Sequence, residues 1–289
     1  MTLELEFTKM HGAGNDFVVL DGIAQELPPL EPLARRLGDR HLGVGFDQML
    51  VVRRSKAADF RMEIYNADGS QAEMCANGIR AFYKFLRDRG YADADSIRVE
   101  TLGGIVVPRW AGEDMVTVEM GTPVLAPAKI PTLLGDGDGP VLDARLEVGG
   151  GTLRISSVSM GNPHAVIYVD DVDDAPVGEL GPLVESHPAF PNRVNVEFVE
   201  VVSRERLRQR TWERGTGETL ACGSGACAVA VVSVLRGVVD PTVTVALPGG
   251  DLSIQWDGEG ASVFMTGPAT SVFTGRIEIE RRSSCSKES

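Results

Sequence analysis

Two segments of the chain carry a helical pattern of apolar positions that ends at a glycine. Residues 78–89 repeat apolar side chains at the helical period and stop at Gly90. Residues 225–236 are apolar at nearly every position and stop at Gly237. Glycine often follows a helix because it adopts the left-handed conformation without steric cost. The pattern predicts two helices, and the second, which lacks a polar face, is expected to be buried.

Alternating apolar and polar residues flank both predicted helices, which favours β-strands. The segments of this kind are residues 1–7, 96–100, 115–120, 166–169, 243–247 and 252–256. Residues 126–140 contain several glycines and prolines and are expected to form a loop. Strands on both sides of a helix predict a sheet that wraps around that helix.

The two halves of the chain resemble each other at one offset. Asn15 and Asn162 each follow a glycine and lie 147 positions apart, and Cys75 and Cys222 have the same separation. Three glycines recur at this offset, Gly78, Gly90 and Gly103 as Gly225, Gly237 and Gly250. A matched cysteine among matched glycines predicts an internal duplication.

The duplication defines the expected fold. It is a mixed α/β (α+β) fold of two pseudo-symmetric domains, each a curved, mainly antiparallel sheet around a central helix, with the active site in the cleft between them. We expect the first domain to contain residues 1–122 and 268–280, and the second residues 123–267. The polar tail, residues 281–289, is expected to be disordered.

Charge and composition exclude several classes of protein. The net charge of −13 disfavours a sequence-independent nucleic-acid binder, which needs a basic face. No apolar run approaches the roughly 20 residues of a membrane helix. The acidic N-terminus does not have the basic start of a signal peptide, so we expect a cytoplasmic protein.

Cysteine and histidine spacing argues against a metal site or a disulfide scaffold. The four cysteines contain no C-x-x-C pair, and no two of the four histidines have the spacing of metal ligands. We therefore expect reduced thiols and no metal. Cys227, inside the apolar helix, is expected to be a buried hydrophobic residue, and Cys285 lies in the polar tail.

Cys75 and Cys222 each lie directly before a predicted helix. Unpaired N–H groups at a helix start are expected to lower the pKa of a nearby thiol from its usual value of about 8.5 and to bind a carboxylate. If the two helix starts face one cleft, the sulfurs lie on opposite sides of the carbon beside that carboxylate. One thiolate then removes the α-proton and the other thiol returns a proton, which inverts the configuration without a cofactor.

Motifs along the chain resemble those of the diaminopimelate epimerase family, over about residues 7–275. In chain order they are KMHGAGNDF (9–17), GVGFDQ (43–48), YNADGS (65–70), MCANG (74–78), MGNPH (160–164), RVN (193–195), WERGTGET (212–219) and ACGSG (221–225). The resemblance implies a cofactor-independent epimerase that interconverts LL-2,6-diaminoheptanedioate and its meso isomer, in lysine and peptidoglycan precursor synthesis.

The resemblance also implies roles for individual residues. Cys75 matches the position that donates a proton, and Cys222 the position that accepts one. His164 and Glu213 match residues that tune the cysteine pair. The remaining matches are to substrate-binding positions, with backbone N–H groups at Ala76, Asn77, Gly223 and Ser224 and side chains at Asn15, Gln48, Asn66, Asn162, Asn195, Glu213 and Arg214.

Two positions depart from the family pattern. Ala76 stands where the family usually has glycine, which raises the question of backbone strain beside Cys75. Phe273 stands where the family often has a tyrosine associated with dimerisation, so a homodimer is expected with an apolar contact in place of the hydroxyl.

Two alternatives remain open from the residues alone. One is a related two-cysteine racemase acting on proline, hydroxyproline or histidine, which would not need Arg214 to grip a distal carboxylate. The other is a binding protein, or an isomerase of the same fold with different acid–base groups, which would not need two symmetric cysteines.

Overall fold

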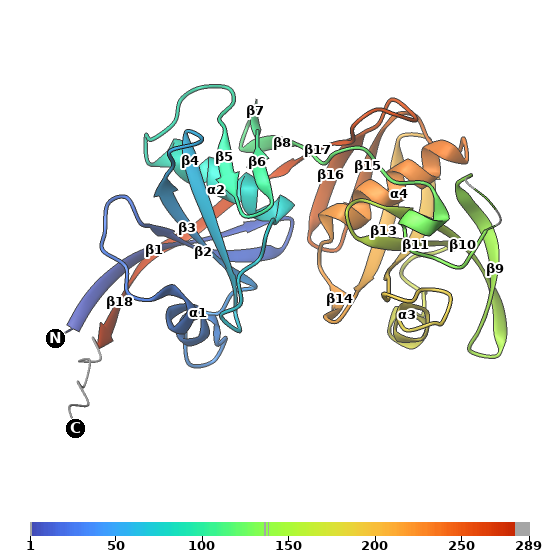
Figure 1. Cartoon of the computed structure of the whole chain (residues 1–289), viewed down its shortest axis with the longest axis horizontal. Helices are drawn as coiled ribbons and strands as arrows, with labels where there is room; N and C mark the ends of the chain where they lie inside the picture. Colours follow the sequence, from blue (N-terminus) through green and yellow to red (C-terminus); the bar gives the residue numbers. More distant parts are fainter. Residues whose placement is uncertain (1, 136, 138, 281–289) are drawn as a thin grey trace. The chain divides into compact units, whose positions relative to one another are not determined.

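The computed structural model describes residues 2–135, 137 and 139–280, and within them the chain forms two compact units (Figure 1). The first unit contains residues 2–12, 16–108 and 269–280, and the second contains residues 13–15 and 109–268. The predicted tail, residues 281–289 with Cys285, lies outside the described residues.

The first unit is a sheet with two helices. The strand order is β18-β1-β2-β3-β4-β5-β6. The strands are β1 (Thr2–Gly12), β2 (Asn15–Asp21), β3 (Gln48–Arg54), β4 (Phe60–Asn66), β5 (Val99–Thr101), β6 (Gly104–Val106) and β18 (Thr270–Glu280). The helices are α1 (Leu30–Gly38) and α2 (Ala76–Asp88).

The second unit repeats this plan with a larger sheet. Its order is β7-β8-β17-β16-β15-β13-β12-β11-β10-β9, and β14 pairs with β13. The strands are β7 (Arg109–Gly112), β8 (Met115–Glu119), β9 (Val141–Val148), β10 (Gly151–Ser159), β11 (Pro163–Tyr168), β12 (Asn195–Ser203), β13 (Arg206–Glu213), β14 (Gly217–Thr219), β15 (Thr242–Leu247), β16 (Gly250–Gln255) and β17 (Phe264–Pro268). The helices are η1 (Pro127–Lys129), α3 (Val177–Glu185) and α4 (Gly223–Leu235).

The helices follow the predicted duplication. α1 and α3 begin at Leu30 and Val177, and α2 and α4 begin at Ala76 and Gly223, each pair 147 positions apart. Parallel pairing of β2 with β3 and of β11 with β12 stands among largely antiparallel neighbours. The predicted mixed α/β fold with mainly antiparallel sheets is confirmed.

Side chains along the central strands of the second unit point alternately to the two faces of the sheet. One face packs against α3 and the other against α4. Val196 and Phe198 belong to the core cluster that includes Val177 and Val184 of α3. Asn195 and Glu197, which alternate with them on β12, therefore point to the opposite face, where α4 contacts β10, β11 and β12. The α4 face thus carries the buried polar side chains Asn195 and Glu197.

The first unit uses the same alternation. Val18 and Val51 pack in one cluster with Leu33 and Leu37 of α1. Leu50 lies on the other face, near the start of α2, where a Cβ on Gly78 would come within 3.3 Å of its side chain. Strands covered on both faces explain the continuous apolar runs in β2 and β3.

The domain boundary differs from the prediction. Residues 109–122 were assigned to the first domain, but β8 pairs antiparallel with β17, with Met115 opposite Pro268 and Glu119 opposite Phe264. This pairing places residues 109–122 in the second unit. At the offset of 147, residues 115–119 correspond to residues 262–266, which overlap β17, but the repeat does not show that the two strands pair with each other.

The predicted central helices are confirmed, and each begins two residues earlier than the apolar pattern indicated. Among its described residues, the loop predicted at residues 126–140 contains only the short helix η1. Helices α1 and α3 were not predicted. None of the helices in the described residues combines the length and the apolar character needed to cross a membrane.

Helix α3 provides a test of the packing on its face of the sheet. A Cβ at Gly181 would lie 2.6 Å from Cγ of Trp212, whereas a Cβ at Gly178 in the same helix would meet nothing within 4 Å. We expect Gly181→Ala to lower the free energy of unfolding by about 1–3 kcal/mol through overpacking. Gly178→Ala is the matched control and should stabilise the protein by up to about 1 kcal/mol. Urea unfolding of both variants measures the difference, and equal effects would contradict the packing described.

Candidate active site

Each predicted cysteine caps a buried helix with its own sulfur. Cys75 lies before α2 with extended backbone, and its Sγ accepts a hydrogen bond from the Gly78 N–H at 3.2 Å. Cys222 lies before α4 in the same conformation, and its Sγ accepts from the Gly225 N–H at 3.3 Å. A side-chain acceptor for the third N–H of a helix is the usual arrangement of an N-cap. Thiols in this role are therefore held at the positive end of a helix dipole.

The glycine at the third position of α4 is required by its neighbours. A Cβ on Gly225 would lie 2.9 Å from Glu197 Oε1 and 3.0 Å from Gln209 Nε2. The first turn of α4 therefore packs directly on the polar face of β12 and β13.

Cys222 is buried, and its surroundings oppose ionisation. Burial is the main factor that raises the pKa of the Cys222 thiol well above its usual value, and the charges of Glu213 and Glu197 raise it further. Hydrogen bonds from Ser224 and the Gly225 N–H act in the opposite direction but are weaker. The predicted lowering of the thiol pKa is therefore wrong for Cys222, because desolvation and two carboxylates outweigh the helix start.

A chain of hydrogen bonds leads from the interior to Cys222. Nδ1 of His164 lies 2.7 Å from Glu197 Oε1, and both side chains are fully buried. Nε2 of His164 lies 3.0 Å from Asn162 Oδ1, and Asn162 Nδ2 donates to Ser224 Oγ at 3.2 Å. Ser224 Oγ lies 3.6 Å from Cys222 Sγ. The structure thus brings together His164, Asn162, Ser224 and Cys222 from separate parts of the predicted set.

Glu213 also lies beside Cys222. Burial raises the pKa of the Glu213 carboxyl, and the hydrogen bond from Thr219 Oγ1 partly opposes that shift. The interaction with the Cys222 thiol is among the weaker factors that lower it. The raised pKa makes the Glu213 carboxylate a stronger base than an exposed one, placed beside the Cys222 thiol.

The segment around Arg214 is held by its backbone. Asn195 Oδ1 accepts from the Arg214 N–H at 2.8 Å, and Asn195 Nδ2 donates to the Pro163 carbonyl at 3.3 Å. The exposed Arg214 guanidinium donates to the Asn192 carbonyl at 2.9 Å. Asn195 thus fixes the path of the chain at Arg214.

Two residues that the sequence analysis missed support this site. Glu197 stands between the apolar residues Val196 and Phe198 of β12, and this placement was the available signal. Glu185 ends α3 and accepts from the Trp212 Nε1–H at 2.7 Å and from the Gly215 N–H at 2.9 Å, which holds the segment that carries Glu213. No sequence signal distinguishes Glu185 from a surface acid.

In the first unit, two predicted amides contact each other on the α2 face. Gln48 and Asn66 are opposite each other on β3 and β4, and Gln48 Nε2 donates to Asn66 Oδ1 at 3.0 Å. Asn66 Nδ2 donates to Ser70 Oγ at 3.0 Å. Asn15 opens β2.

Ala76 resolves the question raised by its departure from the family pattern. It is the first residue of α2, and it is not among the non-glycine residues with positive φ. Alanine therefore fits there without backbone strain. Asn77 follows it and is buried.

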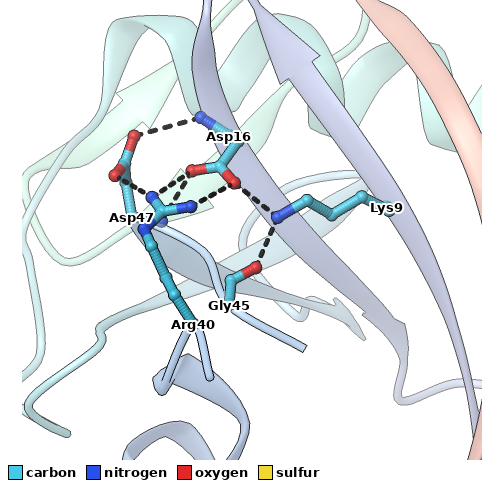
Figure 2. A network of polar contacts seen from close by, with 5 residues as sticks. All are labelled: Lys9, Asp16, Arg40, Gly45 and Asp47. Atoms are coloured by element: carbon cyan, nitrogen blue, oxygen red, sulfur yellow. Dashed lines mark hydrogen bonds and ion pairs between the residues drawn. The ribbon is translucent and has the colours of Figure 1, made fainter. Parts of the chain in front are cut away.

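A compact network of charges joins the first two motifs (Figure 2). The Arg40 guanidinium donates to both carboxylate oxygens of Asp16 at 3.0 and 2.8 Å and to Asp47 Oδ1 at 2.7 Å. Lys9 Nζ donates to Asp16 Oδ2 and to the Gly45 carbonyl. Asp16 and Asp47 also exchange backbone hydrogen bonds, with the Asp16 N–H donating to Asp47 Oδ2 at 3.1 Å. The network fixes the starts of β2 and β3.

The charges of this network determine the ionisation of Asp16. Burial alone would raise the pKa of Asp16, but hydrogen bonds and charges from Arg40 and Lys9 outweigh it and lower the pKa to about 2. Asp16 directly follows Asn15, and Asp47 directly precedes Gln48. Two predicted substrate-binding residues are therefore the chain neighbours of this network.

The sequence matches the family model for diaminopimelate epimerase over residues 7–126 and 156–272, which include both capping cysteines. The chain belongs to the diaminopimelate epimerase family. It is 50% identical over 279 residues to the diaminopimelate epimerase of Chromobacterium violaceum, covering 96% of this chain and 100% of that one. It is 51% identical over 280 residues to that of Aromatoleum aromaticum, with the same coverage.

Solved structures of more distant proteins share the fold of this family member. A PhzF-family phenazine biosynthesis protein from Bacillus anthracis matches with a TM-score of 0.70 at 16% identity, over 95% of this chain and 99% of that one. A hydroxyproline epimerase from Agrobacterium vitis matches with a TM-score of 0.64 at 16% identity, over 96% and 93%. At this identity the likeness concerns the fold alone.

In the part of the chain that the structure describes, no group of three or more His, Cys, Asp or Glu side chains is arranged to hold a metal ion.

The lowered pKa of Asp16 makes its contribution to stability depend on pH. Its pKa is about 2 in the folded protein, against about 3.9 in an unfolded chain. The ionised carboxylate therefore stabilises the fold fully above about pH 5, and this contribution is lost as the pH falls towards 2. We expect Asp16→Asn to lower the free energy of unfolding at pH 7, with a deficit that shrinks between pH 5 and pH 2.

Urea unfolding across this pH range measures the effect. Asp251→Asn is the matched control, because it removes one partner of the exposed Arg206–Asp251 pair, which has the same two-point geometry. The control should change stability by less than about 0.5 kcal/mol. A deficit for Asp16→Asn that does not depend on pH would contradict the account of Asp16.

Proposed function

We propose that this protein interconverts LL-2,6-diaminoheptanedioate and meso-2,6-diaminoheptanedioate. The observation that carries the proposal is the family membership at about half identity over nearly the full length of the relatives. The two cysteines that cap α2 and α4 support it, because both thiols are held at helix starts. The product would serve lysine and peptidoglycan precursor synthesis, a role that goes with a cytoplasmic location.

In the proposed reaction Cys222 removes the α-proton and Cys75 donates one from the opposite face. Cys222 must first lose its own proton, and the adjacent Glu213 carboxyl, whose pKa is raised by burial, is suited to accept it. The carbanion that forms is stabilised as an enediolate by the N–H groups at the two helix starts. In the reverse direction the cysteines exchange roles. The proposal requires no cofactor.

Substrate recognition is assigned to polar groups at the two helix starts and on nearby strands. The N–H groups of Ala76, Asn77, Gly223 and Ser224 belong to the first turns of α2 and α4, where backbone donors point out of the helix and bind carboxylates. Arg214 is assigned to the carboxylate at the distal, unreactive centre, which a guanidinium can grip at two points. The further assigned side chains are Asn15, Gln48, Asn66, Asn162, Asn195 and Glu213, and His164 is assigned to tuning the cysteines.

Exchange of the α-proton with D₂O tests the substrate and the two cysteines together. We expect deuterium to enter LL-diaminopimelate and not proline, hydroxyproline or histidine, as measured by proton NMR. Fast exchange into one of the single-centre amino acids would favour the alternative of a related racemase.

Cysteine variants in the same assay test the mechanism. Cys75→Ala and Cys222→Ala should each lower epimerisation by about 10²–10⁴-fold, the usual contribution of a positioned acid or base. Cys227→Ala is the matched control, because Cys227 is buried in the body of α4. Near-normal turnover by either of the first two variants would exclude the two-thiol mechanism.

We further propose that the protein forms a homodimer through β18. Phe273 on this edge strand is half exposed, and its ring packs edge-to-face on Phe7 with centroids 6.0 Å apart. An apolar ring on a sheet edge is suited to contact a second subunit.

Light scattering of two neighbouring variants tests this contact. We expect Phe273→Asp to yield monomers, because a charge in an apolar interface is costly to bury. Val272→Asp is the matched control, since Val272 is also exposed but adjacent strand residues point to opposite faces. A dimer that persists in Phe273→Asp would place the interface elsewhere.

A further inference from the structure

Glu197 is a buried acid to which no role has been assigned. Its carboxylate lies on the α4 face of β12, is fully buried, and has Oε1 2.7 Å from Nδ1 of His164. Among the described residues, its second oxygen, Oε2, has no hydrogen-bond partner. Burying a carboxylate with so little compensation is costly unless a cation stands beside it. The neighbouring imidazole of His164 is the group able to supply that cation.

The hydrogen bonds of His164 point to the same charge state. Nδ1 faces the carboxylate of Glu197, and Nε2 lies 3.0 Å from Asn162 Oδ1. A carboxylate oxygen and an amide carbonyl oxygen can only accept hydrogen bonds. With Oδ1 of Asn162 facing Nε2, both ring nitrogens of His164 are donors, an arrangement that only the doubly protonated imidazolium provides.

We propose that Glu197 is a positioning residue that holds His164 as an imidazolium and, through it, orients Asn162 and Ser224 towards the thiol of Cys222. The structural part of the proposal stands without the proposed function. Its consequence for turnover rests on that function.

The charge of His164 determines which group donates in each hydrogen bond between His164 and Cys222. With an imidazolium, Asn162 turns Oδ1 to His164 and donates through Nδ2 to Ser224 Oγ at 3.2 Å. The hydroxyl proton of Ser224 then remains available for Cys222 Sγ, 3.6 Å away. A neutral ring with a bare Nε2 would require Asn162 to turn over, and Ser224 would then donate to Asn162 and accept from the thiol. Only the arrangement with an imidazolium leaves Ser224 as a hydrogen-bond donor to a thiolate at Cys222.

The charges that face this chain come from three strands and a helix start. They are Glu197 on β12, Glu213 on β13, His164 on β11 and the thiol of Cys222. An imidazolium beside Glu197 offsets the repulsion that this carboxylate exerts on a thiolate. Glu213 then remains as the acid that exchanges a proton with Cys222.

Nitrogen-15 NMR of the histidine rings tests the charge state directly and needs no substrate. Protonated and bare ring nitrogens differ widely in chemical shift, and His164→Gln assigns the signal among the four histidines. We expect both nitrogens of His164 to be protonated in the wild-type protein at pH 7. A bare nitrogen in that spectrum would overturn the proposal, whatever the variants do.

Glu197→Gln should convert His164 to a neutral ring with one bare nitrogen. Glu200→Gln is the matched control, because Glu200 is on the same strand but on the opposite face, where it pairs with Arg208. The control should leave the His164 signals unchanged. If Glu197→Gln fails to fold, Glu197→Asp keeps the charge with a shorter side chain, and His164 should remain doubly protonated.

Kinetics separate a positioning role from a purely structural one. We expect Glu197→Gln to lower kcat/KM for diaminopimelate about tenfold, the order expected when a charge-assisted hydrogen bond is lost, while Glu200→Gln keeps the wild-type value. A normal kcat/KM in folded Glu197→Gln would overturn the positioning role. Absence of turnover by the wild-type protein would instead contradict the proposed function and leave the NMR result to decide the charge state.

Discussion

The capping of a buried helix by a cysteine sulfur is the interaction on which the arrangement of this protein depends. In each unit the sulfur takes the N–H of a glycine three residues on, at 3.2 Å for Cys75 and 3.3 Å for Cys222. The cap fixes the thiol at the positive end of the helix and leaves the earlier N–H groups of the first turn pointing outwards. In α4 the third residue must also be glycine, because a Cβ there would lie 2.9 Å from Glu197 Oε1.

Burial creates the main electrostatic conflict of the site. A thiolate at Cys222 is opposed by desolvation and by two carboxylates, while the helix start and Ser224 favour it. The second sheet places the buried polar side chains of Asn195, Glu197 and Gln209 on the face of its central strands that packs against α4. The opposite face packs apolar side chains such as Val196 and Phe198 against α3. Alternation along three strands therefore separates the chemistry of the unit from its core.

The sequence predicted the features that follow from local pattern or from repetition. The helices after Cys75 and Cys222, their terminating glycines and the equivalence of the two halves all follow from residues close together in the chain. Helices α1 and α3 were missed because each has only nine residues, and α3 contains Pro182. The raised pKa of Cys222 and the support from Glu185 and Glu197 depend on residues brought together by strand pairing, which no local pattern records.

The pairing of β8 with β17 has a consequence for how the duplication is built into one molecule. These strands occupy equivalent places in the two repeats, yet both lie in the second sheet, while β18, which follows β17 directly, returns to the first. A cut between the two repeats would separate β8 from β17 and β1 from β18. Each of these strands would keep one paired neighbour, β7 for β8 and β2 for β1. Dividing the chain between its two repeats therefore does not give two complete sheets, because each repeat contributes a strand to the sheet of the other.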